Sequence, residues 1–138
     1  MRLSNLFLSV LFSLLTLALI CCKDTINDQS PNDIVFPDSG ISYGKQVEPL
    51  FFRACAFSGC HGADTFDQRG FSLDTYDHMR FGRVSIIFPP DTAASPLMWW
   101  IEKTHGVAER MPPPPRDPLN SNQIKGIGRW ILEGAQNN

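Results

Sequence analysis

Cysteine is scarce in this chain of 138 residues, and its four cysteines fall in two places. Cys21 and Cys22 end an apolar run near the N-terminus, so only Cys55 and Cys60 remain for the rest of the chain. Small exported domains that depend on disulfides usually carry a larger, even set of cysteines. The scarcity therefore excludes a disulfide framework and leaves a single cysteine pair to explain.

The chain also lacks an excess of either charge. Its 12 Lys and Arg residues oppose 14 Asp and Glu residues, which gives a formal net charge of −2. This balance does not favour a nucleic-acid surface, so we expect no nucleic-acid partner. Neither an internal repeat nor clear strand alternation is present, and the length permits one ordinary domain. The sequence therefore predicts a small, mostly α-helical, single-domain protein.

A long apolar run occurs only once, over residues 6–20. It is too short for a comfortable membrane span and fits the apolar part of an export signal. The cysteine that follows resembles a bacterial lipoprotein processing site, where an acylated cysteine becomes the new N-terminus. Cys22, preceded by Cys21, fits such a site better than Cys21, preceded by the bulky Ile20. We expect a lipoprotein-type signal peptide over residues 1–21 and lipidation at Cys22, with an uncleaved N-terminal anchor as the alternative.

The chain after Cys22 divides into two parts. Residues 22–41 are rich in Asp, Asn, Ser and Pro, and their few apolar residues show no period, which predicts a flexible tether. Residues 42–138 form the predicted domain. Either form of the N-terminus places this domain outside the cytoplasm, in the bacterial periplasm or cell envelope, and attaches it to a membrane.

Four helices can be predicted, three of them with clear buried faces and one a short helix that carries Tyr76 and Met79. The first carries Tyr43, Val47, Leu50 and Ala54 on one face and leads directly into Cys55. A later helix begins at Ser95-Pro96, with the serine hydroxyl as cap and Leu97, Trp100 and Ile101 on the buried side.

The last helix has the strongest signal. Asn120 and Gln123 form a capping-box pattern, with Leu119 and Ile124 as the matching hydrophobic staple. Gly126 and Gly128 each cost a helix about 1 kcal/mol relative to alanine, so they predict a close approach by another backbone.

Residues 55–62 read CAFSGCHG and carry the chemistry. Two thiols close in sequence can form thioethers with the two vinyl groups of haem, and a histidine directly after the second cysteine can ligate the iron. The usual spacing places two residues between the cysteines, whereas this chain has four. The extra residues must loop out, and Ser58-Gly59 gives that freedom. Gly62 would let the backbone lie close to the porphyrin.

Other uses of Cys55 and Cys60 remain open from the motif alone. A local disulfide leaves His61 without a role. A zinc site needs about four ligands, and the chain has no second cysteine pair. A redox dithiol usually has a two-residue spacing in a βαβ context, which this sequence lacks.

Met111 is the best candidate for a second iron ligand, because methionine is common in that position. It lies between two predicted helices and is followed by four consecutive prolines, which hold the backbone stiff and extended. Met79 falls in a short helix that Asp74 or Thr75 is predicted to cap, and Met98 falls in the helix that begins at Ser95-Pro96, so packing is the simpler role for both. His78 and His105 are weaker alternative ligands, since lone histidines in polar stretches are usually solvent-exposed.

With these residues the chain resembles the class I c-type cytochromes, and most of all the short planctomycete-type cytochrome c domains of exported bacterial proteins. The likeness spans about residues 42–135 and rests on three segments: Val47-Glu48-Pro49-Leu50 with the CAFSGCHG motif, Ser95-Pro96-Leu97, and Met111-Pro112-Pro113 with Leu119, Gln123, Ile127, Trp130-Ile131 and Gly134-Ala135.

The resemblance implies one covalent haem c at Cys55 and Cys60, with His61 as proximal and Met111 as distal iron ligand. It also implies a cytochrome c fold in which the first and last helices cross, with Leu50 and Phe51 facing Trp130 and Ile131 and Gly128 permitting the contact. The carbonyl of Pro89 or Pro90 is a candidate partner for the other ring nitrogen of His61.

We expect an electron-transfer protein held at a membrane by its lipid anchor, with redox proteins as partners and with neither enzymatic activity nor a small-molecule substrate. A haem-based ligand-binding, sensor or peroxidase-like module with a displaceable Met111 is the alternative. The third hypothesis is a small lipoprotein with a metal or a disulfide at the cysteine pair.

Overall fold

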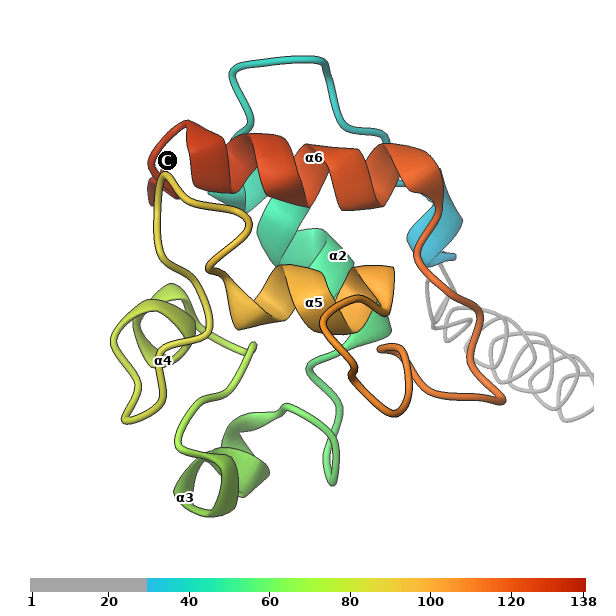
Figure 1. Cartoon of the computed structure of the whole chain (residues 1–138), viewed down its shortest axis with the longest axis vertical. Coiled ribbons are helices and arrows are strands. Elements are labelled where there is room, and N and C mark those ends of the chain that lie inside the picture. The colour runs from blue at the N-terminus through green and yellow to red at the C-terminus, as the bar shows by residue number, and fades with distance from the viewer. Residues whose placement is uncertain (1–29) are drawn as a thin grey trace, which may run out of the picture.

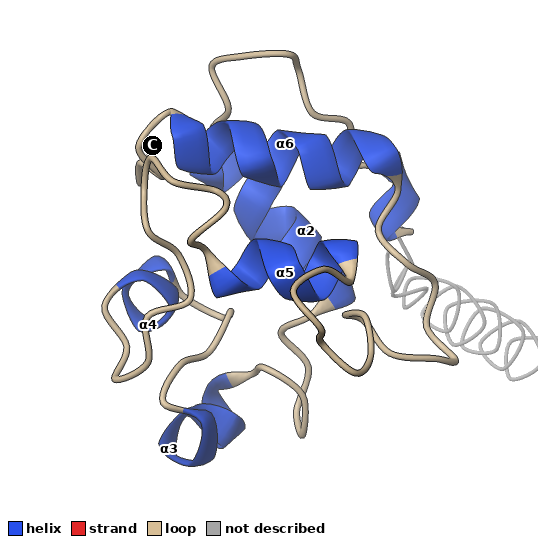
Figure 2. Cartoon of the chain, viewed as in Figure 1, coloured by secondary structure: helices blue, strands red, loops and turns tan. Residues whose placement is uncertain are grey.

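The computed structural model describes residues 30–138, in which five α-helices and three short helical turns enclose one hydrophobic core (Figures 1 and 2). The helices are α2 (Glu48–Ala54), α3 (Phe66–Arg69), α4 (Tyr76–Arg80), α5 (Pro96–Glu102) and α6 (Ser121–Leu132), and the turns are η1 (Pro31–Asp33), η2 (Tyr43–Val47) and η3 (Ala63–Thr65). The described part of the chain has no strand, only an isolated bridge between Phe88 and Asp91. The prediction of a small, mostly α-helical single domain is confirmed.

The predicted signal peptide and the lipidation site at Cys22 lie outside the described residues. None of the helices within residues 30–138 is both long enough and apolar enough to cross a membrane.

The first predicted helix is built from η2 and α2, which follow one another without a break. Pro49 lies at the start of α2, directly after the wider π-helical turn η2. The predicted inner face is confirmed, since Tyr43, Val47, Leu50 and Ala54 are all buried. The helix ends where the Cys55 N–H donates to the Phe51 carbonyl at 2.8 Å, so α2 holds the start of the CAFSGCHG motif.

Helix α6 lies across the molecule above α5, with α2 behind them in Figure 1. Its capping box between Asn120 and Gln123 forms as predicted. The ring of Trp130 lies 5.8 Å from that of Tyr43, so the end of α6 contacts the beginning of the first helix. The Glu133 carboxylate strengthens this junction by accepting the N–H groups of Gly40 and Ile41 at 3.0 and 2.9 Å.

The two glycines of α6 have different neighbours from those predicted. A Cβ at Gly126 would lie 2.1 Å from the Phe36 ring, so this glycine admits a side chain and not a second backbone. A Cβ at Gly128 would meet only Met98 and Thr92, at 3.4 and 3.9 Å. The expectation that Gly128 permits close contact between the first and last helices is therefore wrong.

The segment before the domain is also different from the prediction. Residues 30–41 pack on the core, with Ile34, Phe36 and Ile41 buried. The Phe36 backbone exchanges two hydrogen bonds with the Asn122 side chain of α6, at 2.8 and 3.0 Å. This half of the predicted tether is part of the folded domain, because its apolar residues fit α6 although they follow no regular period. Residues 22–29 lie outside the described residues.

Helix α5 begins at Pro96 as predicted, but the Ser95 hydroxyl does not cap it. That hydroxyl accepts the Phe88 N–H at 2.9 Å and donates to the Asp91 carbonyl at 2.6 Å, so it closes the preceding loop. Leu97 and Ile101 are buried as predicted, whereas Trp100 is 38% exposed. One predicted core position of α5 is therefore only partly covered by protein.

Candidate functional site

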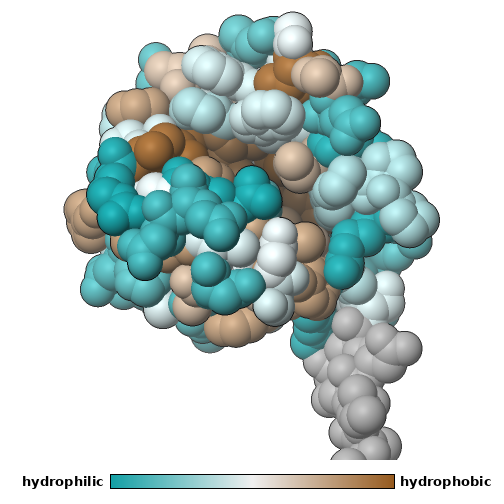
Figure 3. Space-filling model, turned by 90° about the horizontal axis from the view of Figure 1, so that it is seen from below, coloured by the Kyte–Doolittle hydropathy of each residue, from teal (hydrophilic) through white to brown (hydrophobic). Residues whose placement is uncertain are grey.

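The predicted site residues lie around two adjoining pockets. The first has a volume of about 300 Å³ and is lined by Cys55, His61 and Met111, with Trp100 and Phe71 among its mostly apolar neighbours. The second, of about 230 Å³, shares Cys55, His61 and Met111 and adds Cys60. Figure 3 shows the molecule from the side on which α3 lies, where a hollow opens onto hydrophobic residues. The fold thus gathers residues that are up to 56 positions apart in sequence (55 to 111).

The backbone of the motif folds back on itself after α2. The Cys55 carbonyl accepts the N–H groups of Phe57 and His61 at 2.9 and 3.2 Å, which brings His61 back to the end of α2. The His61 carbonyl in turn accepts the Leu73 N–H at 2.7 Å. The histidine backbone is therefore fixed from both sides by residues before and after it.

The two extra residues of the motif occupy the centre of a β-turn. The Phe57 carbonyl accepts the Cys60 N–H at 3.0 Å, and Gly59 has a φ of +75°. A positive φ at the third position of a four-residue turn is typical of type II and requires glycine. The ends of such a turn lie within about 7 Å of each other, so Cys60 lies close to Phe57 despite the residues between them.

The exposed Asp64 side chain stabilises this turn with two hydrogen bonds. Its Oδ2 accepts the Ser58 hydroxyl at 2.9 Å and the Gly59 N–H at 2.8 Å. These hydrogen bonds, first that of Gly59 and then that of Ser58, lower the pKa of the Asp64 carboxyl, so it is ionised at neutral pH. Asp64 could not be predicted from the sequence, because an exposed aspartate carries no signal of its own.

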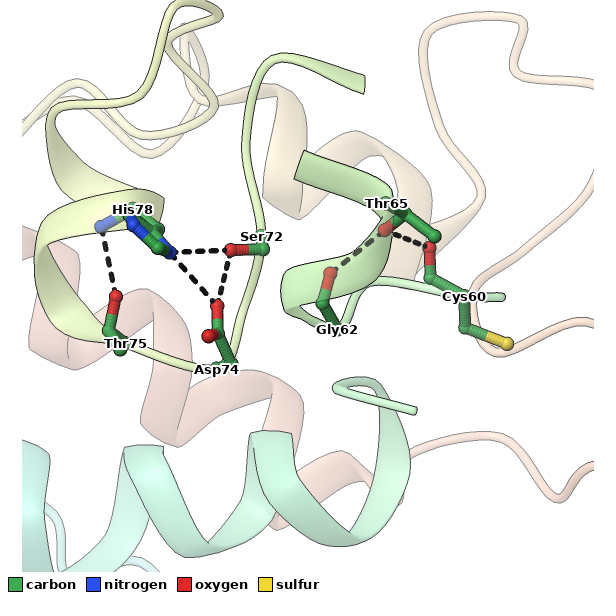
Figure 4. Close-up of polar contacts among 7 residues, drawn as sticks. All are labelled: Cys60, Gly62, Thr65, Ser72, Asp74, Thr75 and His78. Carbon is green, nitrogen blue, oxygen red and sulfur yellow. Dashed lines mark hydrogen bonds and ion pairs between the residues drawn. The ribbon is translucent and has the colours of Figure 1, made fainter. Parts of the chain in front are cut away.

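Thr65 supports the motif from inside. Its hydroxyl contacts the carbonyls of Cys60 and Gly62, each at 3.0 Å, while the sulfur of Cys60 points away from it (Figure 4). A Cβ at Gly62 would lie 3.0 Å from both the Phe57 carbonyl oxygen and Asp64 Oδ1. A side chain at position 62 would therefore crowd the motif itself, in addition to any contact with a bound group.

The surroundings of the His61 ring favour its neutral form. It stacks on Phe71 with ring centroids 5.2 Å apart. Burial, and then the charge of Arg69, lower its pKa, which favours the unprotonated imidazole that metals bind. Its Nδ1 is buried and has no hydrogen-bond partner, so the carbonyl of Pro89 or Pro90 does not orient the ring.

Both cysteines of the motif are free thiols. Burial raises the pKa of Cys55 to about 12, although Arg116 opposes the shift, so its thiol stays protonated at neutral pH. Redox dithiols instead need a thiol with a lowered pKa. The site therefore does not favour thiol–disulfide chemistry at Cys55.

Met111 reaches the pocket on a loop that is tied to α5. The Met111 N–H donates to the Trp100 carbonyl at 2.9 Å. The Arg110 guanidinium donates to the carbonyls of Pro112 and Arg116, which closes the proline-rich segment around the methionine. The other described methionines, Met79 and Met98, are buried in the core and line neither pocket.

The two alternative histidine ligands also lie elsewhere. His105 stacks on Trp99 with ring centroids 4.8 Å apart, and it lines neither pocket. His78 contacts Ser72 and Asp74 through its Nδ1 (Figure 4). Because both partners share this one nitrogen, and Ser72 is hydrogen-bonded directly to Asp74, the three residues cannot relay a proton as a catalytic triad does.

The charges around the two pockets have one sign. Arg69 lines both pockets and Arg116 lines the second, and no Asp or Glu lines either. The guanidinium of Arg116 lies 4.0 Å from the centre of the Phe57 ring, which holds it beside the motif. Neither arginine has a sequence signal, since both are placed by contacts distant in sequence.

Within residues 30–138 no three His, Cys, Asp or Glu side chains are grouped as a metal-binding cluster. A zinc site made of those residue types therefore has no support in the described part of the chain.

Comparison of the chain with protein-family models, with curated proteins and with solved structures returns no match.

Proposed function

We infer that the protein is a mono-haem c-type cytochrome that transfers electrons. The observation that supports this most directly is the convergence of Cys55, His61 and Met111 on one apolar pocket, with Cys60 in the pocket that adjoins it. Two thiols, an imidazole and a thioether are the donor set that covalent haem with His and Met ligation needs.

The pocket fits a flat apolar cofactor that carries a metal. Its volume of about 300 Å³ already reaches the lower end of cofactor sites, which span roughly 300–1,000 Å³, and the adjoining pocket extends it. The His61 ring lines both pockets and stacks on Phe71, and burial lowers its pKa, so a neutral imidazole is available as a ligand. The partly exposed Trp100, on the face of α5 predicted to be buried, is an apolar surface that such a group would cover.

Each residue has a defined task in this proposal. Cys55 and Cys60 would anchor the haem by thioether bonds, which prevent its loss outside the cytoplasm. His61 and Met111 would hold the iron, and with both positions filled none remains for a substrate. Arg69 and Arg116 supply positive charge beside the pocket, which complements an anionic group. Haem in this setting supplies reversible one-electron transfer, so we propose no enzymatic activity.

The finer features of the fold belong to the same proposal. We propose a cytochrome c fold in which the first and last helices cross beside the haem. Leu50, Phe51, Trp130 and Ile131 are buried in one core cluster, and Tyr43 and Trp130 are in contact, which supports this arrangement.

The N-terminal sequence supplies the proposed location. A signal over residues 1–21 and lipidation at Cys22 would make the protein an exported lipoprotein of a bacterial periplasm or cell envelope. Attachment to a membrane surface raises the effective concentration of the carrier near membrane-bound redox partners.

Optical spectra of the purified wild-type and Met111→Ala proteins test the electron-carrier proposal. We expect wild type to show the ferric charge-transfer band of methionine-ligated haem and no spectral change when carbon monoxide is added to the reduced form. Met111→Ala loses that band and binds carbon monoxide, whereas Met98→Ala, a buried methionine away from the pocket, keeps it. Ready binding of carbon monoxide by wild type would instead support a ligand-binding, sensor or peroxidase-like module.

A further inference from the structure

The spacing of the cysteines is the feature in which this site departs from the usual haem-attachment motif. Ser58 and Gly59 are the two central residues of the β-turn from Phe57 to Cys60. Such a turn brings its first and last residues, Phe57 and Cys60, within about 7 Å of each other. Without Ser58 and Gly59, Cys60 would directly follow Phe57. Two residues would then separate it from Cys55, as in the usual motif.

The turn is held by one side chain that comes from the next helical segment. Asp64 belongs to η3, immediately after the motif, and accepts hydrogen bonds from both central residues of the turn, at 2.8 and 2.9 Å. Gly62 leaves room for this contact, because a Cβ there would lie 3.0 Å from Asp64 Oδ1. A carboxylate that accepts two hydrogen bonds forms a strong contact even at the surface.

We propose that Asp64 is a positioning residue for haem attachment, which holds the Ser58-Gly59 turn closed so that the Cys60 thiol lies where the second thioether forms. The proposal rests on the proposed function. Cys55 does not need this help, because its backbone is fixed by the end of α2. Loss of the Asp64 contact should therefore affect Cys60 and spare Cys55.

Each cysteine thiol adds across one vinyl group of the haem, and this addition needs no oxidant. The thiol S–H bond breaks, an S–C bond forms to the vinyl carbon next to the ring, and the thiol hydrogen ends on the terminal vinyl carbon. A cysteine that misses its vinyl group remains a free thiol, and that vinyl group stays conjugated with the porphyrin. Both consequences can be measured.

The test uses the full chain produced with a cytochrome c maturation system, with variants Asp64→Ala and Asp67→Asn. Asp67 lies three residues further on, is exposed and contacts Arg83, so its substitution removes the same charge without touching the turn. Free thiols are alkylated under denaturing conditions and assigned by peptide mass, and the pyridine haemochrome band reports any remaining vinyl group. We expect most Asp64→Ala protein to carry a labelled Cys60, an unlabelled Cys55 and a band shifted to longer wavelength, while Asp67→Asn behaves as wild type.

A second measurement does not depend on haem. In the haem-free protein, Asp64→Ala should make the Gly59 amide hydrogen exchange roughly tenfold faster, as expected when a hydrogen bond to a charged group is lost. Asp67→Asn should leave that rate unchanged.

A deletion tests whether Asp64 acts through the Ser58-Gly59 turn or through the folding of the whole domain. Removal of Ser58 and Gly59 gives the two-residue spacing, and we expect both thioethers to form in that protein. Asp64→Ala in the deletion background should then have no further effect on Cys60.

The outcomes distinguish this inference from the proposed function. Wild-type protein without covalent haem would end the proposed function. Wild type with two thioethers, together with an Asp64→Ala protein that also has two and an unchanged Gly59 exchange rate, would overturn the role of Asp64 alone. A deletion protein that still requires Asp64 would also overturn it.

Discussion

Two parts of the molecule differ in how their apolar surface is covered. The helical half is the contact of the first helix with α6, and the pocket half is the region around Cys55, His61 and Met111. Where the first helix meets α6, the apolar side chains are buried against each other, and Glu133 and Asn122 bind the backbone of residues 36–41. At the pocket, by contrast, Trp100 is 38% exposed. The first part packs its largest aromatic ring, Trp130, entirely within protein, whereas the second leaves part of an indole ring beside an apolar pocket.

Substitution of Trp130 should have the largest effect, because this ring is fully buried in the helical half. Trp130→Ala should lower the free energy of unfolding of the haem-free protein by about 3–5 kcal/mol, the usual cost of emptying a large aromatic site. Denaturant titration followed by circular dichroism measures this. A loss below about 1 kcal/mol, within the range of surface substitutions, would show that the helical half is not the stable part of the protein.

The two glycines of α6 provide a matched pair with a smaller effect. Gly126→Ala places a methyl group against the Phe36 ring, so we expect it to destabilise the protein by about 1–3 kcal/mol through overpacking. Gly128→Ala meets only ordinary contacts and gains helix propensity of up to about 1 kcal/mol, so it should be neutral or stabilising. Equal effects in denaturant titrations would contradict the packing of Phe36 on α6.

The contrast between these glycines shows what the sequence can predict. Helices α2, α5 and α6 were predictable because their signals are local: apolar spacing, a proline start and a capping box. The packing of Phe36 over Gly126 was not, because residues 30–41 have no periodic pattern and their partner lies 90 positions further along the chain (36 to 126).

The same division applies to the candidate site. Cys55, Cys60, His61 and Met111 could be selected from their residue types and spacing, and the structure places them around adjoining pockets. Asp64, Arg69 and Arg116 could not, since exposed charged residues are common and only their contacts distinguish these three. Trp100 was assigned to the core because a helical pattern indicates which face is apolar, and does not indicate what covers that face.

Substitution of Trp100 should affect the haem-free and haem-loaded proteins to different extents. Because it is partly exposed, Trp100→Ala should lower the free energy of unfolding of the haem-free protein by less than about 1 kcal/mol. The loss should be larger in haem-loaded protein, where the ring is expected to be covered. Denaturant titrations of both forms measure the difference, and equal losses would contradict the assignment of Trp100 to the proposed haem pocket.

The smallest expected effect is a pH dependence from His61. Its pKa is lowered in the folded protein, so the unfolded chain binds the proton more readily. The stability of the haem-free protein should therefore decrease as the pH falls below about 6.5, the ordinary histidine value. His61→Asn should reduce that slope, while His105→Asn, which alters an exposed ring, should leave it unchanged. Identical slopes in all three proteins would show that His61 is not desolvated.

The central claim is tested most directly by the mass of the wild-type protein after maturation with the cytochrome c assembly system and denaturation. The account predicts that one haem remains bound and that neither Cys55 nor Cys60 can be alkylated. A protein that loses its haem on denaturation, or that has two reactive thiols at these positions, would contradict it.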